Sequence, residues 1–232
     1  MRIRSIVRSR AFLLAPLLLA ASLAWAAAPR VVVAPGNVVE NATVVIRDGV
    51  IESVAAGAAP PAGARVWSLS GHTVYPGFID AYTHVGMPSE VPDEDRGPVN
   101  WNRQVRSFTT AASEFSDNGG RTAELRQQGF TAALALPELG IFRGQGAVVS
   151  LGDGMAGERV VRGDVVHGLS LVRDNRAGPG YPTSAMGAIT FIRQTFHDAD
   201  WYDRAHRAWA SNPEGLRRPE RDRALEALVP VV

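Results

Sequence analysis

The stretch Gly71-His-Thr-Val-Tyr-Pro-Gly-Phe-Ile-Asp-Ala-Tyr-Thr-His-Val-Gly86 decides how the rest of the chain is interpreted. It begins as a polar turn, continues through apolar residues and places Asp80, Tyr82 and His84 at alternate positions. Alternate side chains of a β-strand point to the same face of a sheet. We therefore predict a strand that presents a carboxyl, a phenol and an imidazole together, as the edge of a functional site would.

Short runs of β-branched residues precede this strand. They occupy residues 30–33, 42–47, 50–54 and 64–68, and such runs are typical of strands. Asp48-Gly49 lies between the second and third runs, and this dipeptide is the strongest short hairpin signal. Residues 29–73 are therefore predicted to form a β-unit that is too small to be stable without packing on something larger.

Helical patterns follow the strand. Apolar residues at helical spacing predict a helix over residues 105–115. A second, short helix is predicted over residues 122–128, with Gly129 at its C-terminal cap. The apolar run 130–136 then predicts a buried strand. The order strand, helix, strand indicates a βαβ unit and a parallel pair of strands.

The rest of the chain divides into a glycine-rich part and a helical part. Residues 137–182 are predicted to be a β-rich excursion with strands at 147–151 and 159–166. A long helix is predicted from Ala185 to Trp209, with Ser184 as its N-cap and Asn212-Pro213 after its end. A last short helix is expected to open at Pro219.

Composition and charge exclude one class of partner. The chain has 232 residues, 46% of them hydrophobic and 20% charged, with a formal net charge of +1. This is ordinary globular composition, with no basic field that would bind nucleic acid. The sequence leaves the oligomeric state open.

The first residues resemble an export signal. Four arginines within residues 1–10 precede an apolar run over residues 11–24, and Ala24-Trp25-Ala26 has the form of a cleavage site. The apolar run is shorter than the roughly 20 residues that a spanning helix needs, so we predict a signal peptide over residues 1–26. The chain contains no cysteine and hence neither a lipid-attachment cysteine nor a disulfide. A periplasmic or secreted protein, with no membrane segment in its mature form, is expected.

The motif Pro76-Gly-Phe-Ile-Asp-Ala-Tyr-Thr-His84 resembles the first barrel strand of the amidohydrolase superfamily, of the imidazolonepropionase-like and related metal-dependent hydrolase type. The hairpin region 41–54 and the lead-in Gly71-His-Thr-Val74 resemble the same family. The resemblance implies an α/β protein: a small N-terminal β-sandwich unit (29–73) and, over 74–232, the start of a (β/α)₈ TIM-like barrel interrupted by the β-rich excursion. Such a barrel takes roughly 250 residues, so we expect the chain to be a portion of a longer sequence.

The resemblance also implies a small-molecule substrate as the partner and hydrolysis of carbon–nitrogen bonds other than peptide bonds. A water that a divalent metal activates would carry out this hydrolysis, and Zn²⁺ is the expected ion. Two imidazoles at positions i and i+2 of a strand face the same way and bind one ion. Here His84 is the expected metal ligand, but Tyr82 stands where the family has the first histidine. A neutral tyrosine is a poor ligand for Zn²⁺ because its pKa is about 10. Two interpretations remain open: a metal-dependent hydrolase, and a non-catalytic relative that lost its metal site through Tyr82.

Three other patterns have simpler interpretations. Gly152-Asp-Gly-Met-Ala-Gly157 matches a dinucleotide-binding fingerprint, but a strand pattern follows it where a helix is required, so we predict a hairpin turn. Asp198, Asp200 and Asp203 beside His197 are predicted to be a solvated helix face. His197 and His206 are predicted to point about half a turn apart. Gly144-Gln-Gly146, which follows Phe142-Arg143, is either a substrate-facing loop or, as we favour, a plain turn.

Overall fold

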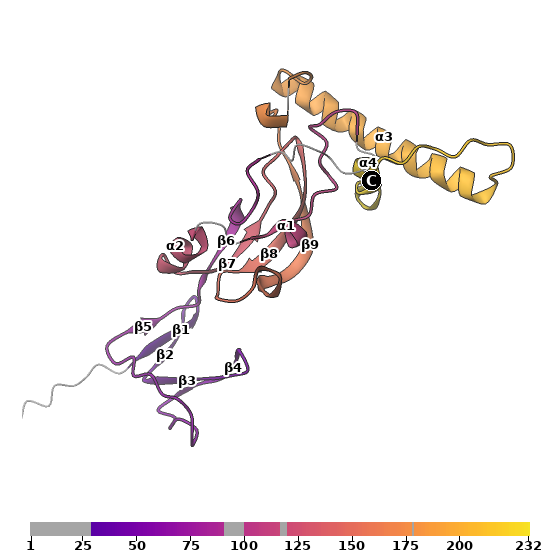
Figure 1. Cartoon of the computed structure of the whole chain (residues 1–232). Helices are drawn as coiled ribbons and strands as arrows, with labels where there is room; N and C mark the ends of the chain where they lie inside the picture. The colour runs from indigo at the N-terminus through magenta and orange to yellow at the C-terminus, as the bar shows by residue number, and fades with distance from the viewer. Residues whose placement is uncertain (1–28, 91–99, 117–119, 178) are drawn as a thin grey trace, which may run out of the picture. The chain divides into compact units, whose positions relative to one another are not determined.

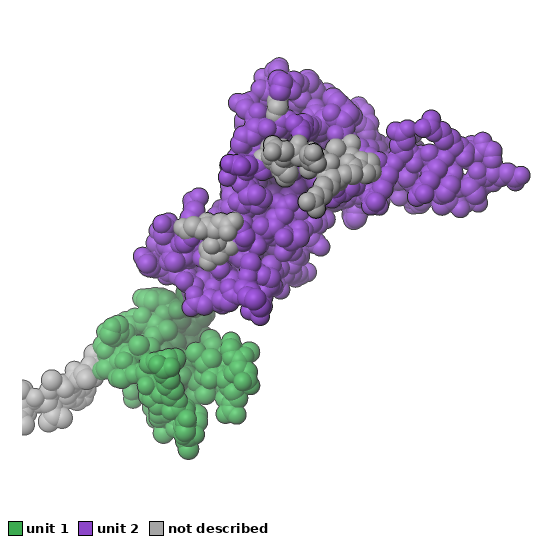
Figure 2. Space-filling model, in the orientation of Figure 1, with its two compact units in different colours: residues 1–76 green, residues 77–232 purple. Residues whose placement is uncertain are grey.

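The computed structural model describes residues 29–90, 100–116, 120–177 and 179–232. The predicted signal peptide lies outside these ranges, as does most of the acidic segment before Asn100. The chain divides into two compact units, Met1–Pro76 and Gly77–Val232 (Figure 2), which are described separately below. In the described part of the chain, no helix is long and apolar enough to cross a membrane.

The first unit consists of two small sheets (Figure 1). Its strands are β1 (Arg30–Ala34), β2 (Asn37–Glu40), β3 (Ala42–Arg47), β4 (Val50–Ala56) and β5 (Thr73–Val74). One sheet has the order β2-β1-β5 and the other pairs β3 with β4. The β3–β4 hairpin turns at Asp48 and Gly49, which have positive φ values of 51° and 78°, as the two central residues of a type I′ turn require. The predicted hairpin is confirmed.

The predicted strand at residues 64–68 is wrong. These residues have no strand partner; instead, several of their side chains, with those of β3, line an open groove of about 360 Å³. Trp67 remains 67% exposed. Among the described residues of this unit, only Val31 and Ala42 are buried hydrophobic residues, so the unit has very little core of its own.

The second unit is built on a four-stranded sheet with the order β6-β7-β8-β9. Its strands are β6 (Phe78–Thr83), β7 (Phe130–Ala135), β8 (Phe142–Ser150) and β9 (Val160–Leu169). β6 and β7 are parallel, and α1 (Ala111–Glu114) and α2 (Arg121–Gln127) lie between them in the chain. The predicted βαβ unit and the α/β class are therefore confirmed. The sheet is open, and the described residues form no closed barrel.

The predicted helix over residues 105–115 is wrong for most of its length, because only α1 is helical. The preceding residues instead run beside β8. The amide of Arg106 donates to the carbonyl of Phe142, and the carbonyl of Thr109 accepts from the amide of Gln145. These bonds to a neighbouring strand replace the i→i−4 bonds of a helix. The apolar side chains that suggested helical spacing are still used in the core, since Val105 and Phe115 are buried.

The β-rich excursion is confirmed, with strands longer than predicted. β8 and β9 pair antiparallel, and residues 152–157 connect them with the short 3₁₀ helix η1 (Ala156–Arg159). The glycine-rich motif is thus a connection between paired strands, as predicted. Residues 144–146, predicted to be a turn or a loop, belong to β8 instead. Gly144 has no room for a Cβ because the carbonyl of Thr109 approaches it.

The C-terminal part is helical. α3 (Ala185–Ser211) begins at the predicted N-cap, where Ser184 Oγ accepts a hydrogen bond from the amide of Gly187. The last helix, α4 (Arg223–Glu226), begins later than predicted and is capped by Asp222. The remaining elements are the 3₁₀ turns η2 (Asn175–Ala177) and η3 (Val229–Val231).

Two hydrophobic clusters form the core of this unit. One joins α3 and α4 to the start of β8, with Phe142 and Phe191 among its buried side chains. The other packs β7 and β8 against α1 and contains Ala111, Ala133 and Val149. The two clusters include Val85, in the loop after β6, and Ile141, in the loop after β7. Both loops are therefore anchored to the core.

Candidate functional site

β6 places Tyr82 near its end and His84 immediately beyond it. The two rings lie 5.2 Å apart between centroids, in an edge-to-face arrangement. Asp80 belongs to the same strand but is used locally, because its Oδ1 accepts a hydrogen bond of 3.1 Å from the amide of Tyr82. Tyr82 and His84 are therefore neighbours on one face. The carboxyl of Asp80 instead forms a local hydrogen bond with the backbone.

The imidazole of His84 is held in one orientation by the neighbouring strand. Its Nδ1 lies 2.8 Å from the carbonyl oxygen of Leu136, the residue after β7. A carbonyl oxygen only accepts hydrogen bonds, so Nδ1 is a donor here and Nε2 is the ring nitrogen left for another partner. Metal-binding histidines are usually held in this way. The same hydrogen bond links the ends of the two parallel strands.

Tyr82 contacts a cation that the sequence did not associate with it. Nη1 of Arg143, on β8, donates a hydrogen bond of 2.7 Å to the hydroxyl of Tyr82. The side chain of Tyr82 is otherwise largely exposed, at 58%. The position that the resemblance assigns to a histidine therefore holds a phenol bonded to a guanidinium.

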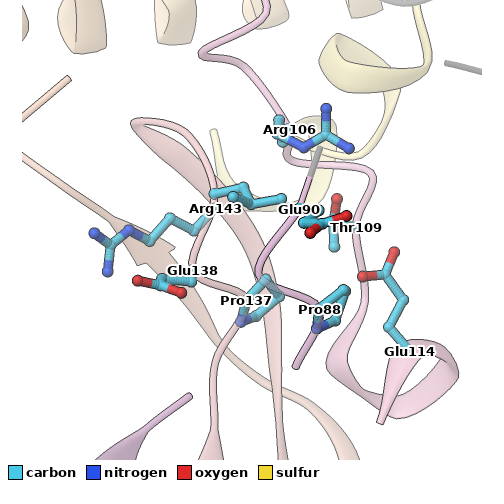
Figure 3. Close-up of a pocket in the computed structure, with 9 residues that line it drawn as sticks. Pro88, Glu90, Arg106, Thr109, Glu114, Pro137, Glu138 and Arg143 are labelled. Atoms are coloured by element: carbon cyan, nitrogen blue, oxygen red, sulfur yellow. The ribbon is translucent and has the colours of Figure 1, made fainter. Parts of the chain in front are cut away.

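A small cavity of about 90 Å³ opens at the carboxyl ends of β6 and β7 (Figure 3). Pro88 and Glu90 reach it from the loop after β6, and Pro137 and Glu138 from the loop after β7. Ligands of open α/β sheets bind outside the carboxyl ends of the parallel strands. The polar side chains that line the cavity are those of Glu90, Arg106, Thr109, Glu114, Glu138 and Arg143.

Two polar atoms of these residues are buried without a hydrogen-bond partner. They are Thr109 Oγ1 and Arg143 Nε. Thr109 as a whole is only 6% exposed. Buried polar atoms without partners are uncommon in proteins, and each one needs an explanation.

The acidic residues of the cavity differ in their surroundings. Burial raises the pKa of the Glu114 carboxyl, and the positive charge of Arg106 partly opposes this effect. Glu138 is instead paired with Arg176, whose Nη1 lies 3.2 Å from its carboxylate and also donates to the carbonyl of Ser89. Arg176 therefore ties the loop after β6 to the loop after β7.

Asp174 completes this network. Its Oδ1 lies 3.0 Å from Nε of Arg176, and its Oδ2 accepts from the amide of Gly140. Burial acts to raise the pKa of Asp174, but the hydrogen bonds from Arg176 and Gly140 outweigh it and hold the pKa below its usual value. The pKa of Arg176 is correspondingly raised by its bonds to Asp174 and Glu138.

The other residues considered from the sequence lie elsewhere. His167 is on β9, where both ring nitrogens lack hydrogen-bond partners and burial lowers its pKa. His197 and His206 are both on α3, and the ring of His206 packs on Tyr202. Asp200 and Asp203 pair with arginines one turn further along the same helix, as a solvated face would.

The described residues do not by themselves complete a metal site. No group of three or more His, Cys, Asp or Glu side chains in the described ranges is arranged to hold an ion. His84 has the orientation of a ligand, but its neighbour Tyr82 is bonded to a positive charge. The sequence did not predict that Thr109, Arg106 and Glu114 would line a site. Arg143 was considered only as a residue next to a possible substrate-facing loop.

Comparison with known proteins gives one structural relative for this arrangement. No protein-family model and no curated protein sequence matches the chain. The fold is similar to that in the crystal structure of an amidohydrolase from Thermotoga maritima, with a TM-score of 0.57 and 23% sequence identity. The match covers 79% of this chain and 49% of that protein. The chain therefore has an amidohydrolase-like fold and spans about half the length of the relative.

Proposed function

We propose that this chain is part of an exported hydrolase of the amidohydrolase type, which cleaves carbon–nitrogen bonds other than peptide bonds. In this proposal β6 and β7 are the first two strands of a (β/α)₈ barrel. The motif from Pro76 to His84 supports it, as do the parallel pairing of β6 with β7 and the similarity in fold to the amidohydrolase from Thermotoga maritima.

The orientation of His84 is the observation that carries the proposal. Its Nδ1 is engaged by the Leu136 carbonyl, so Nε2 is the nitrogen that would bind a divalent ion such as Zn²⁺. A bound ion of this kind supplies a nucleophilic water at neutral pH. The described residues do not provide the remaining ligands, so we derive no catalytic step through the ion.

Bound metal and turnover test the proposal together. The protein expressed from its own gene is analysed for Zn, Mn and Fe by elemental analysis and assayed against a panel of amides and lactams. We expect about one equivalent of metal, which His84→Ala removes, and turnover that is lost with it. His72→Ala is the matched control, because Nδ1 of His72 also bonds a backbone carbonyl but lies in the first unit. A folded, metal-free protein that hydrolyses none of the panel would refute the proposal.

A second function is favoured by the bond between Arg143 and Tyr82. A permanent positive charge bonded to Tyr82, whose ring contacts that of His84, opposes a second cation nearby, as expected if the fold now binds a ligand without catalysis. In that case the protein is metal-free, and His84→Ala changes neither metal content nor turnover. Ligand binding near Arg143 would persist.

A further inference from the structure

Another cavity of the second unit is lined largely by α3, the long helix in Figure 1, and has a volume of about 170 Å³. Three aromatic side chains line it, those of Trp101, Tyr181 and Phe191. Phe191 is buried, whereas Trp101 and Tyr181 are 78% and 48% exposed. Aromatic side chains dominate the energetics of cores and interfaces. Two exposed rings that meet a buried one at a cavity therefore indicate a binding surface.

The three rings are arranged around a common space. The rings of Trp101 and Phe191 lie 6.4 Å apart between centroids at an interplanar angle of 90°. Those of Tyr181 and Phe191 lie 6.0 Å apart at 79°. Right angles between neighbouring rings are the geometry of adjacent walls of a box. The face of an aromatic ring is negative and attracts a cation within about 6 Å of its centroid.

The segments that carry the rings are held in place before any ligand binds. The side-chain amide of Asn102, next to Trp101, donates a hydrogen bond of 2.9 Å to the carbonyl of Tyr181. The hydroxyl of Tyr181 donates to the carbonyl of Gly187 on α3, and Phe191 belongs to the main hydrophobic cluster. A binding site that is already ordered loses little conformational entropy when its ligand binds.

The charge of the cavity favours a cation. Asp198 supplies the one carboxylate among the described lining residues, and no arginine is among them. Gln194 donates a hydrogen bond of 2.7 Å to Oδ1 of Asp198. Asp200 and Asp203 on the same helix each pair with an arginine, but Asp198 forms no ion pair within the described ranges. The cavity therefore combines negative ring faces with a carboxylate that no described cation neutralises.

The hydroxyls of the cavity indicate which kind of cation it binds. Those of Tyr181, Thr190 and Thr195 all donate to backbone carbonyls. Their hydrogens are therefore not available to a ligand that depends on directed hydrogen bonds, such as a sugar. A quaternary ammonium carries no N–H and is recognised by ring faces alone. We propose that this cavity binds the quaternary ammonium group of a small molecule, between the three rings and beside Asp198.

The size of the cavity agrees with such a head group. Its volume of about 170 Å³ exceeds the roughly 10–15 Å³ that one water requires and is below the roughly 300–1,000 Å³ of a pocket for a whole drug-sized ligand. A trimethylammonium group fits, and the rest of a larger ligand extends past the exposed ring of Trp101. The cavity shares no lining residue with the one at the ends of β6 and β7, so the inference does not depend on the proposed function.

The test uses choline as the probe. Its neutral counterpart is the dimethylbutanol in which a carbon replaces the nitrogen of choline and the shape is kept. Binding to the protein expressed from its own gene is measured by titration with saturation-transfer NMR. We expect choline to bind saturably and the neutral alcohol to bind at least about fivefold more weakly, because the attraction between cation and ring faces is lost.

Two variants separate the contribution of the rings from that of the carboxylate. Trp101→Leu should weaken choline binding by at least about fivefold, and Trp101→Phe, which keeps a ring, should lose less. Asp198→Asn keeps an acceptor for Gln194 but removes the charge, and should weaken choline binding by about threefold, as expected for a partly exposed charge pair. Binding of the neutral alcohol should be the same in Asp198→Asn as in the parent protein.

Two matched controls remove the same residue types outside the cavity. Trp201→Leu replaces another tryptophan of α3, which is 60% exposed, and Asp200→Asn removes a carboxylate that already pairs with Arg204. Both should leave choline affinity within about twofold of the parent value, as surface substitutions usually do. No saturable choline binding, equal binding of the neutral alcohol, or unaltered affinity in both Trp101→Leu and Asp198→Asn would overturn the inference. Saturable binding of methyl glucoside without binding of choline would also overturn it.

Discussion

The hydroxyl of Tyr82 on β6 accepts its 2.7 Å hydrogen bond from Arg143 on β8, although β7 lies between these strands in the sheet. Both side chains therefore reach across the end of β7, where the Leu136 carbonyl holds His84. The resemblance implies a metal near His84, and the structure places a guanidinium on the neighbouring Tyr82. The positive charge of this guanidinium opposes a second cation nearby, although solvent reduces the effect because the pair is exposed.

This relationship predicts how metal binding at this strand can be strengthened. Tyr82→His recreates two imidazoles on one face of β6, but the Arg143 guanidinium still opposes a cation. We expect the double variant Tyr82→His/Arg143→Gln to bind Zn²⁺ at least about tenfold more tightly than either single variant, as measured by competition with a chromophoric chelator.

Loss of that affinity on adding His84→Ala would show that the ion binds at this strand. If Tyr82→His alone already binds Zn²⁺ as tightly as the double variant, the guanidinium is not the obstacle. The absence of other ligands would then be the main limit on affinity.

Local signals made much of the fold predictable. The Asp48-Gly49 turn, the Ser184 cap and the apolar run before Leu136 each determine their own element from a few neighbouring residues. The segment before α1 was not predictable in the same way, since Arg106 and Thr109 find their backbone partners on β8. Apolar spacing indicated correctly which side chains are buried there but not the backbone conformation.

The candidate site was predictable only in part, for the same reason. Alternation along β6 placed Tyr82 beside His84. The contact of Tyr82 with Arg143 joins residues that are 61 positions apart in the chain. No local sequence pattern predicts a contact of this kind. The unpartnered hydroxyl of Thr109 is a property of the cavity and becomes visible only when the surrounding elements are assembled.

The cap of the long helix provides a prediction about stability. Ser184 Oγ accepts from the Gly187 amide at the start of α3, and α3 contributes Phe191 to the main hydrophobic cluster. Ser184→Ala should lower the free energy of unfolding by about 1 kcal/mol, measured by urea denaturation. Ser184→Asp should retain most of the stability, because aspartate is an equally good N-cap. Equal losses in both variants would contradict the capping role.

The edge position of β6 leads to a prediction about association. Phe78 and Ile79 are 61% and 68% exposed, and β6 has no strand partner on its outer side among the described residues. An exposed apolar edge strand promotes pairing between molecules. Ile79→Lys should therefore reduce self-association in sedimentation velocity experiments over a range of concentrations. Val172→Lys, at a residue that is 74% exposed outside the strands, is the control and should have little effect.

The network around Arg176 predicts a pH dependence. The pKa of Asp174 is lower in the folded protein than its usual value. A group with a depressed folded pKa contributes stability above its unfolded pKa of about 4 and loses it as pH falls through the folded pKa. Asp174→Asn should therefore be less stable than the parent protein at pH 7 and pH 5, and the difference should shrink below about pH 4.

Urea unfolding at pH 7, 5, 4 and 3 measures this difference directly. Asp153→Asn is the control, because the Asp153 side chain is 97% exposed in its ion pair with Arg126 and such pairs contribute little. A difference between Asp174→Asn and the parent that stays constant from pH 7 to pH 3 would mean that the Asp174 side chain stabilises the loops by packing alone. A difference that closes with acid, and only for Asp174, would mean that its charge holds Arg176 in place. Since Arg176 also binds Glu138 and Ser89, the cavity wall would then loosen over the same pH range.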